Sequence, residues 1–167
     1  MEWRCLTEEE LAELCDTALL QDFPAAELRP KAATLKMLRR GVYRPWGVFV
    51  SESDMPGCPP MERLAAYLLI ACPLAEGPVL LDYFAVRPDF RESGVGAELL
   101  SELALREGRD ILIEAETPET APDTPLARRR LGFYHRCGAL PTPWWDRVFQ
   151  GRFDVLVLPA PGTKRPG

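Results

Sequence analysis

The sequence predicts a mixed α/β domain, with a sheet of about six or seven strands flanked by about four helices. Short runs of β-branched and aromatic residues alternate with amphipathic segments of helical period. Turns rich in proline and glycine separate these segments. The chain has 167 residues, which is within the size of one domain. We therefore expect a single domain over residues 1–159 and a disordered tail over 160–167.

The N-terminal elements carry local start and stop signals. Residues 3–6 are suited to a short first strand. Thr7 then caps a helix that reaches about Leu20, and Glu10 completes a capping box with it. A second helix follows Pro30 and ends before Gly41, a residue that commonly follows a helix end.

The rest of the chain alternates between strands and helices. Residues 46–52 and 63–73 are predicted strands joined by the Pro- and Gly-rich turn 54–60. We expect the later elements in the following order: strand 79–86, a helix to about 107, strand 110–116, loop 117–125, a helix ending at 138, and a hairpin of strands 144–149 and 153–158.

The most informative segment joins the predicted strand 79–86 to the following helix. The apolar run stops at Pro88, and Arg91-Glu92-Ser93-Gly94-Val95-Gly96 opens the helix. A strand, a glycine turn and a helix N-terminus together form a site suited to an anion. Arg91 adds a charge that can form paired hydrogen bonds to phosphate oxygens.

Two common phosphate motifs do not match this segment. The P-loop needs a Lys-Ser/Thr pair after its last glycine, and Ala97-Glu98 stands there. The dinucleotide fingerprint needs a third glycine, and Leu99 occupies that position. A nucleotide-binding domain of either class is therefore excluded.

A second motif lies near the end of the chain. Thr124 is the predicted N-cap of a helix with Pro125 in its first turn, and Gly138 ends it. Tyr134 falls on the same helical face as Ala127 and Leu131. The tyrosine is therefore expected to point inward.

These two motifs, R-x-x-G-x-G after a strand and F-Y-x-R-x-G at the end of a later helix, resemble those of the GNAT superfamily of acyl-CoA-dependent N-acyltransferases. They occur in the family's order and are separated by one strand. The resemblance covers nearly the whole chain. It implies an enzyme that transfers an acetyl group directly from acetyl-CoA to a primary amine of a small molecule or peptide.

The resemblance also implies a set of site residues. Tyr134 would donate a proton to the departing sulfur, and the backbone of Phe84 and Val86 would bind the pantetheine arm. An asparagine often found before the tyrosine in this family is replaced here by Leu126 and Ala127. The implied cofactor-binding residues are Phe84, Ala85, Val86, Arg91, Glu92, Ser93, Gly94, Val95, Gly96, Ala97, Tyr134 and Arg136.

Asp82 and Glu116 are the candidates for the catalytic base. Asp82 shares a strand face with Phe84 and Val86, and Glu116 shares one with Glu114. A carboxylate in a central strand is costly unless it is partnered or used in chemistry. For each of them taken alone, a strand-end or hydrogen-bonded surface carboxylate is the favoured interpretation, and the resemblance allows a water relay to act as the base instead. The segment that includes Glu27 resembles one that borders the acceptor pocket in a subset of the superfamily.

The composition of the chain limits which ligands and partners we expect it to bind. The net charge of −5, without a basic face, argues against nucleic acid and favours a cationic acceptor. Five cysteines lack C-x-x-C spacing, so we expect free thiols and no metal site. An acyl-cysteine mechanism would depend on His135, the single histidine, and is disfavoured.

Hydropathy and the acidic N-terminus bear on the compartment. No apolar run approaches the ~18 residues of a membrane span. The first residues also lack the apolar core of a signal peptide. We expect a cytoplasmic monomer or homodimer that does not bind membranes. A catalytically silent acyl-CoA-binding regulatory module of the same fold is the alternative, although Gly94, Gly96 and Tyr134 argue against it.

Overall fold

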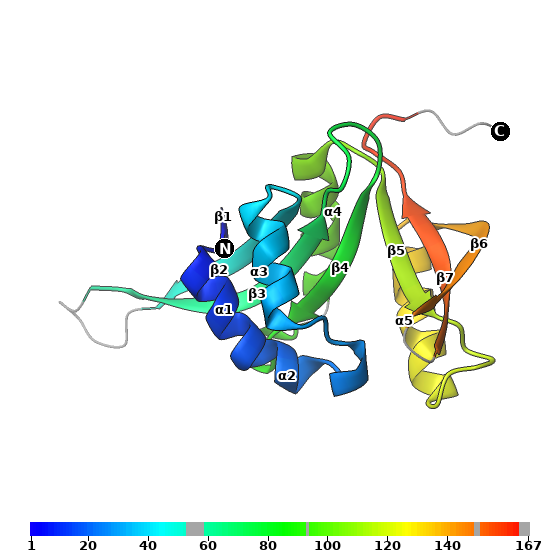
Figure 1. Cartoon of the computed structure of the whole chain (residues 1–167), viewed down its shortest axis with the longest axis horizontal. Helices are drawn as coiled ribbons and strands as arrows, with labels where there is room; N and C mark the ends of the chain where they lie inside the picture. Colours follow the sequence, from blue (N-terminus) through cyan, green and yellow to red (C-terminus); the bar gives the residue numbers. More distant parts are fainter. Residues whose placement is uncertain (53–58, 93, 149–150, 164–167) are drawn as a thin grey trace. The chain divides into compact units, whose positions relative to one another are not determined.

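The structure is a computed structural model that describes residues 1–52, 59–92, 94–148 and 151–163. The described residues contain seven strands in one mixed sheet, ordered β1-β2-β3-β4-β5-β7-β6, together with five α-helices (Figure 1). The predicted fold class is thereby confirmed. The chain divides into two compact units, Met1–Ala71 with Asp82–Val95 and Cys72–Leu81 with Gly96–Gly167, called unit 1 and unit 2 below.

Unit 1 is built on antiparallel strands covered by short helices. Strand β2 pairs with β1 on one side and with β3 on the other, so that Cys5 lies opposite Trp46 and Tyr43 opposite Ala71. Helix α1 contacts α2 and α3, and α3 contacts β2 (Figure 1). The core of this unit includes the fully buried Tyr67 and Leu11. The elements are β1 (Glu2–Cys5), α1 (Glu8–Asp16), α2 (Ala18–Asp22), η1 (Ala25–Glu27), α3 (Lys31–Arg39), β2 (Tyr43–Glu52), β3 (Met61–Ala71), the second half of β4 (Val79–Val86) and η2 (Pro88–Phe90).

The first helix differs from the prediction by a break at Thr17. Its hydroxyl donates to the Glu13 carbonyl at 2.7 Å, and its backbone N–H donates to Leu14 at 3.3 Å. Its backbone, at φ −129° and ψ −87°, is not helical. A threonine that bonds to the previous turn disturbs a helix in this way, so the predicted single helix is divided into α1 and α2.

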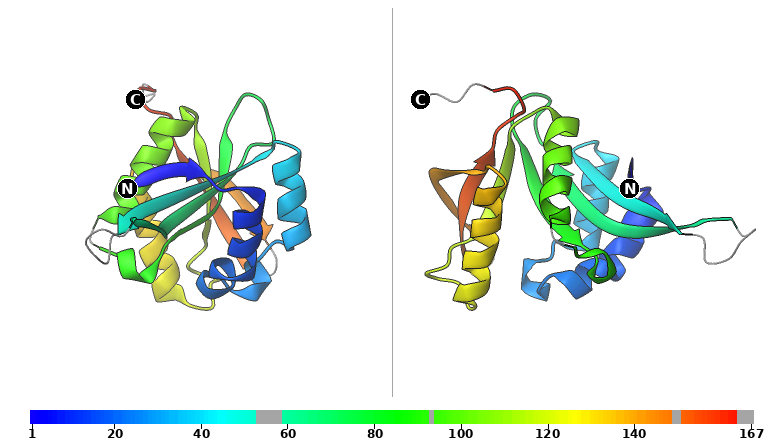
Figure 2. Two further views of the ribbon diagram at one scale, coloured as in Figure 1. Left: turned by 90° about the vertical axis from the view of Figure 1, so that its left-hand side faces the viewer. Right: turned by 180° about the vertical axis from the view of Figure 1, so that it is seen from behind.

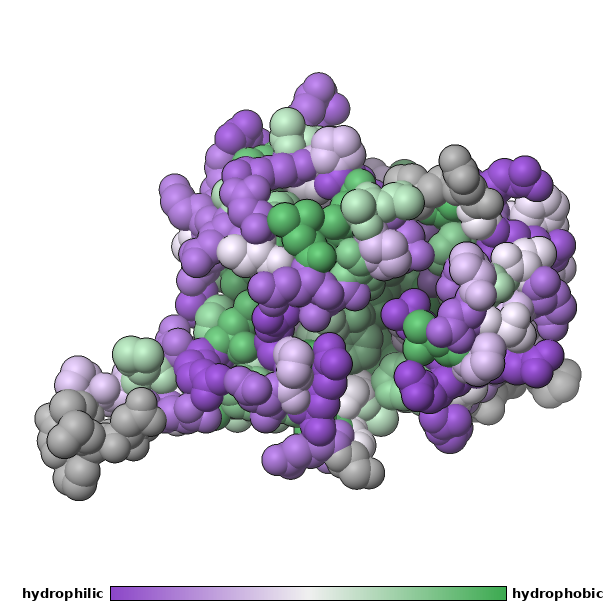
Figure 3. All heavy atoms as spheres, turned by 90° about the horizontal axis from the view of Figure 1, so that it is seen from below, coloured by the Kyte–Doolittle hydropathy of each residue, from purple (hydrophilic) through white to green (hydrophobic). Residues whose placement is uncertain are grey.

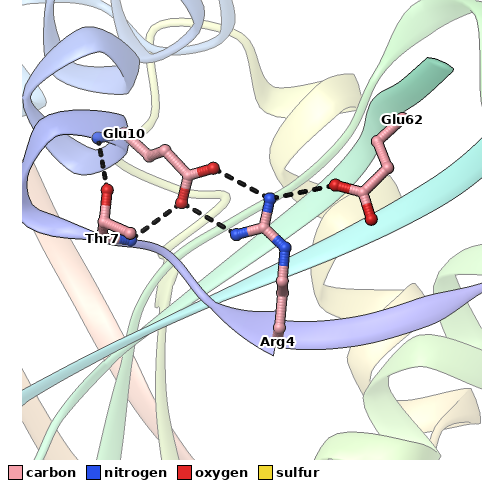
Figure 4. A network of polar contacts seen from close by, with 4 residues as sticks. All are labelled: Arg4, Thr7, Glu10 and Glu62. Atoms are coloured by element: carbon pink, nitrogen blue, oxygen red, sulfur yellow. Dashed lines mark hydrogen bonds and ion pairs between the residues drawn. The ribbon is translucent and has the colours of Figure 1, made fainter.

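The predicted capping box of α1 is present and belongs to a larger polar network (Figure 4). Glu10 accepts the Thr7 N–H at 2.8 Å and both terminal nitrogens of Arg4 at 2.8 Å. Arg4 also donates to Glu62 at 3.3 Å, and its guanidinium lies 3.9 Å from the centre of the Phe49 ring. One arginine thus joins β1 to α1 and β3.

Unit 2 combines parallel and antiparallel pairing. Val79–Leu81 of β4 pair in parallel with Ile111–Ile113 of β5. Strand β5 is antiparallel to β7, which is antiparallel to β6. Helix α5 contacts β5, and Figure 2 shows α5 in yellow beside the strands of this unit. The elements are α4 (Val95–Glu107, with Val95 in unit 1), β5 (Ile111–Glu116), α5 (Thr124–Arg136), β6 (Leu140–Val148) and β7 (Gly151–Leu158).

Element ends differ from the predictions by a few residues. Asp123, and not Thr124, is the N-cap of α5, and its carboxylate accepts the Leu126 N–H at 2.9 Å. Most of the predicted turn 54–60 lies outside the described residues, as do 149–150 and 164–167 of the predicted hairpin and tail. Within the tail, the Ala160 N–H donates to Asp110 at 2.7 Å.

The surface and the thiols agree with the composition. On the face shown in Figure 3, hydrophilic residues cover most of the surface, with hydrophobic residues visible between them. Cys5, Cys15, Cys72 and Cys137 take part in no disulfide among the described residues, and Cys58 lies outside those residues. Along the described part of the chain, no helix combines the length and the apolar composition needed to cross a membrane.

Candidate active site

The turn between β4 and α4, together with the first turn of α4, holds seven of the twelve predicted cofactor-binding residues. Gly94 has a φ of 89°, a left-handed conformation that side chains with a Cβ rarely adopt. A Cβ built on Gly94 would meet no described atom within 4 Å, so the space beside it is open. Helix α4 begins at Val95, and Gly96 and Ala97 lie in its first turn, where N–H groups lack partners within the helix. Ser93 lies outside the described residues.

Arg91 is held against the end of β4. Its Nε donates to the Val86 carbonyl at 2.8 Å, and its Nη2 lies 3.7 Å from Oδ1 of Asp22. The side chain is 57% exposed. The arginine therefore presents its charge to solvent next to the Gly94 turn, while the exposed side chain of Glu92 adds a negative charge beside it.

The end of β4 is partly accessible. Phe84, Ala85 and Val86 are half-buried, whereas Tyr83 is buried. Beyond Val86, the Arg87 N–H donates to the Ala65 carbonyl of β3 at 2.8 Å. This end of β4, which the resemblance predicts to bind the pantetheine arm, is thus anchored to β3 inside unit 1.

Asp82 is a partnered carboxylate. Its side chain is only 10% exposed. Both of its oxygens accept from the Arg29 guanidinium, and the Tyr43 hydroxyl donates to Oδ2 at 2.7 Å. Burial, together with the nearby carboxylate, raises the pKa of Tyr43, so its hydroxyl stays protonated. These contacts favour the structural interpretation of Asp82 over a role as proton acceptor.

Tyr83, on the neighbouring position of β4, fixes the same N-terminal segment. Its hydroxyl donates to the Glu27 carbonyl at 2.8 Å and accepts the Arg29 N–H at 2.9 Å. The Phe23 ring packs edge-on against it, with 5.1 Å between ring centres. The segment that precedes α3 is thus ordered by β4. Sequence reasoning missed Arg29, Tyr43 and Tyr83, although the need of a buried Asp82 for a partner was a signal.

Tyr134 lies near the end of α5 in unit 2. Ala127, on the same helical face, is buried, and Phe133 packs edge-on against the tyrosine at 5.3 Å between ring centres. Burial raises the pKa of Tyr134, so the phenol is protonated at neutral pH. Among the described residues, its hydroxyl has no hydrogen-bond partner. The group is therefore available to donate to a ligand.

Two further predicted residues belong to unit 2. Glu116 ends β5 half-buried and opposite Phe153, and the next residue, Thr117, is buried. The Thr117 hydroxyl has no hydrogen-bond partner among the described residues. Arg136 is exposed in the last turn of α5, where its Nη1 lies 3.2 Å from a Cβ built on Gly132. Within the described ranges, no cluster of three or more His, Cys, Asp or Glu side chains could hold a metal ion.

Comparison with known proteins establishes the fold. No protein-family model and no curated protein matches the sequence. Among solved structures, the chain is similar to a protein assigned to the GNAT acetyltransferase family from Bacteroides thetaiotaomicron, with 20% identity, 94% of this chain and 86% of that chain covered, and a TM-score of 0.67.

Two solved structures of named acetyltransferases are also similar to this chain in fold. A spermidine N-acetyltransferase from Vibrio cholerae, in complex with CoA and spermine, is 9% identical, with 95% of each chain covered and a TM-score of 0.63. An aminoglycoside 6′-N-acetyltransferase complexed with CoA is 12% identical over 100% of both chains, with a TM-score of 0.60. This chain therefore has the GNAT fold, and the predicted resemblance is confirmed at that level.

Proposed function

We propose that this protein is an N-acetyltransferase that moves an acetyl group from acetyl-CoA directly to a primary amine of a small molecule or peptide. The observation that carries the proposal is the R-x-x-G-x-G turn at the end of β4 in a GNAT fold, with Gly94 left-handed and open space beside it. Structurally similar proteins that bind CoA support the choice of cofactor.

The residues present fit an acyl-CoA diphosphate. A helix N-terminus, whose first N–H groups have no partner within the helix, and a glycine without a Cβ allow close approach of phosphate oxygens. The exposed guanidinium of Arg91 supplies the opposite charge. We assign the diphosphate to Arg91, Glu92, Ser93, Gly94, Val95, Gly96 and Ala97, and the pantetheine arm to the backbone of Phe84, Ala85 and Val86. Arg136 is assigned to the cofactor as well.

The reaction forms a C–N bond and breaks the C–S bond of the thioester that acetyl-CoA supplies. Tyr134 has the properties of the acid that protonates the departing sulfur, since it is protonated and free to donate. An N–H group of β4 near Val86 is suited to polarise the thioester carbonyl. The amine must lose a proton, for which we propose Glu116 or a water relay, because the Arg29 ion pair gives Asp82 another role.

The acceptor we propose is an amine that carries additional positive charge. The protein is acidic, with a net charge of −5. Spermine is bound in one structurally similar enzyme, and an aminoglycoside is named as substrate of another. Asp82 contributes little to this preference because Arg29 compensates its charge, so the preference rests on Glu116 and the remaining acidic surface.

A thiol-release screen tests the proposal. Purified protein is incubated with acetyl-CoA and, in separate reactions, polyamines, amino sugars, amino acids and peptides with free N-termini. The proposal predicts release of free CoA that depends on one class of amine. Binding of acetyl-CoA without release of thiol across the panel would instead indicate the silent acyl-CoA-binding module.

A further inference from the structure

A buried carboxylate, that of Asp22, lies near Arg91 in the turn between β4 and α4, and the proposed reaction gives it no role. Asp22 is the last residue of α2, and its side chain is only 7% exposed. Its Oδ2 accepts from the Tyr67 hydroxyl at 2.8 Å and from Nη1 of Arg87 at 2.6 Å. Its Oδ1 lies 3.7 Å from Nη2 of Arg91. Three side chains from β3, from the end of β4 and from the turn thus converge on one carboxylate.

The location of Asp22 is unfavourable for both the helix and the carboxylate itself. A negative charge in the last turn of a helix opposes the partial charge of the carbonyl groups there. A buried carboxylate also loses hydration and needs partners to compensate. Neither helix formation nor solubility therefore accounts for an acid at this position. The contacts with the two arginines offer an explanation.

The two arginines are held unequally. Arg87 is 22% exposed, and its Nη2 also donates to Oε1 of Gln21 at 2.9 Å. Arg91 has one hydrogen bond, from Nε to Val86, and the longer ion pair with Asp22. Among the described residues, the terminal nitrogens of Arg91 make no hydrogen bond, so their N–H groups are available to an anion.

We propose that Asp22 is a positioning residue for the acyl-CoA diphosphate, acting by holding Arg91 beside the Gly94 turn. The inference rests on the proposed function. A carboxylate behind the guanidinium restricts the rotation of a long, flexible side chain, and less conformational freedom is then lost when the phosphate binds. Because Asp22 is shared between two arginines, one positive charge remains to face the ligand.

The Asp22→Asn variant distinguishes a positioning role from an effect of net charge, because the two would change the affinity for acetyl-CoA in opposite directions. If only net charge mattered, the loss of a negative charge would tighten the binding of an anion. If Asp22 positions Arg91, the affinity for acetyl-CoA measured by calorimetry should fall about fivefold, the upper range for a partly exposed ion pair. Asp16→Asn, which removes the same charge from an exposed pair with Lys31, is the control and should bind as wild type does.

A double-mutant cycle with Arg91→Ala tests the route of the effect. In the Arg91→Ala background, Asp22→Asn should cause no further loss of affinity, because the positioned group is absent. An equal loss in both backgrounds would show that Asp22 supports the fold and does not act through Arg91.

Tyr67→Phe keeps the test decisive if Asp22→Asn does not fold. It removes only the hydroxyl that donates to Asp22, and the contacts of Asp22 with Arg87 and Arg91 remain. We expect a smaller loss of affinity, about twofold. Binding equal to or tighter than wild type in these variants would overturn the inference alone. Failure of the wild-type protein to bind acetyl-CoA would overturn the proposed function as well.

Discussion

Replacement of Gly94 by alanine separates the conformational from the binding role of this glycine. At a φ of 89°, an alanine costs roughly 1–2 kcal/mol of folding free energy because its Cβ crowds the following carbonyl. The added methyl meets no described atom within 4 Å, so no steric clash inside the protein adds to this cost. The proposed diphosphate, however, would occupy that space. Loss of one or two of its hydrogen bonds, each worth about 1.5 kcal/mol, lowers the affinity at least ~10-fold.

Gly108→Ala is the matched control. Gly108 is also left-handed, with a φ of 59°, and has equally open surroundings, but it follows the far end of α4. Both variants should lose similar stability in urea titrations. Only Gly94→Ala should weaken acetyl-CoA binding in calorimetry. If the two variants bind acetyl-CoA equally well, the assignment of the diphosphate to this turn is wrong.

Three further variants, one of them with a matched control, test other interactions in the structure. Tyr134→Phe should lower kcat by roughly 10²–10⁴-fold while the affinity for acetyl-CoA stays near that of the wild type. A variant that turns over at the wild-type rate would show that Tyr134 only packs against its neighbours. Arg29→Ala leaves the buried Asp82 carboxylate uncompensated and should cost roughly 2 kcal/mol in urea unfolding, whereas Arg39→Ala, at the exposed pair with Glu8, should change stability little. The hydrogen bonds from Arg4 hold the pKa of Glu10 below its ordinary value, so this pair stabilises the protein above pH 4.5 and the effect disappears as the pH falls further. Glu10→Gln should therefore reduce the melting temperature at pH 7 more than at pH 3, and an equal reduction at both would refute the pairing.

The local elements could be predicted because their signals are short-range. The capping box at Thr7 depends on hydrogen bonds within a few residues, and the glycines at 41, 94 and 138 depend on their own backbone conformation; the structure has each as expected. The break at Thr17 was not predicted because its hydroxyl can bond either to its own helix or to solvent. The period of the hydrophobic residues does not distinguish these two cases. The Asp123 cap was missed because two neighbouring residues are both good caps.

The polar contacts of the candidate site could not be predicted, since their partners are far apart in the chain. Arg29 and Asp82 are separated by 53 residues, and Asp22 and Arg87 by 65. Hydrophobic periodicity identifies the strand on which Asp82 lies but not which distant cation reaches it. The sequence does not distinguish Asp22, because an acid at the end of a helix is usually solvated. Only its burial in the folded chain distinguishes it.

Transfer of a radiolabelled acetyl group tests the central claim most directly. Wild-type protein is incubated with labelled acetyl-CoA and the amine found in the screen, then denatured and separated from small molecules. Direct transfer predicts that the label appears in the amine, with one free thiol per acetyl group and none on the protein. Label retained on a cysteine after denaturation would show an acyl-enzyme, and label found only as acetate would show a hydrolase; either result would contradict the account.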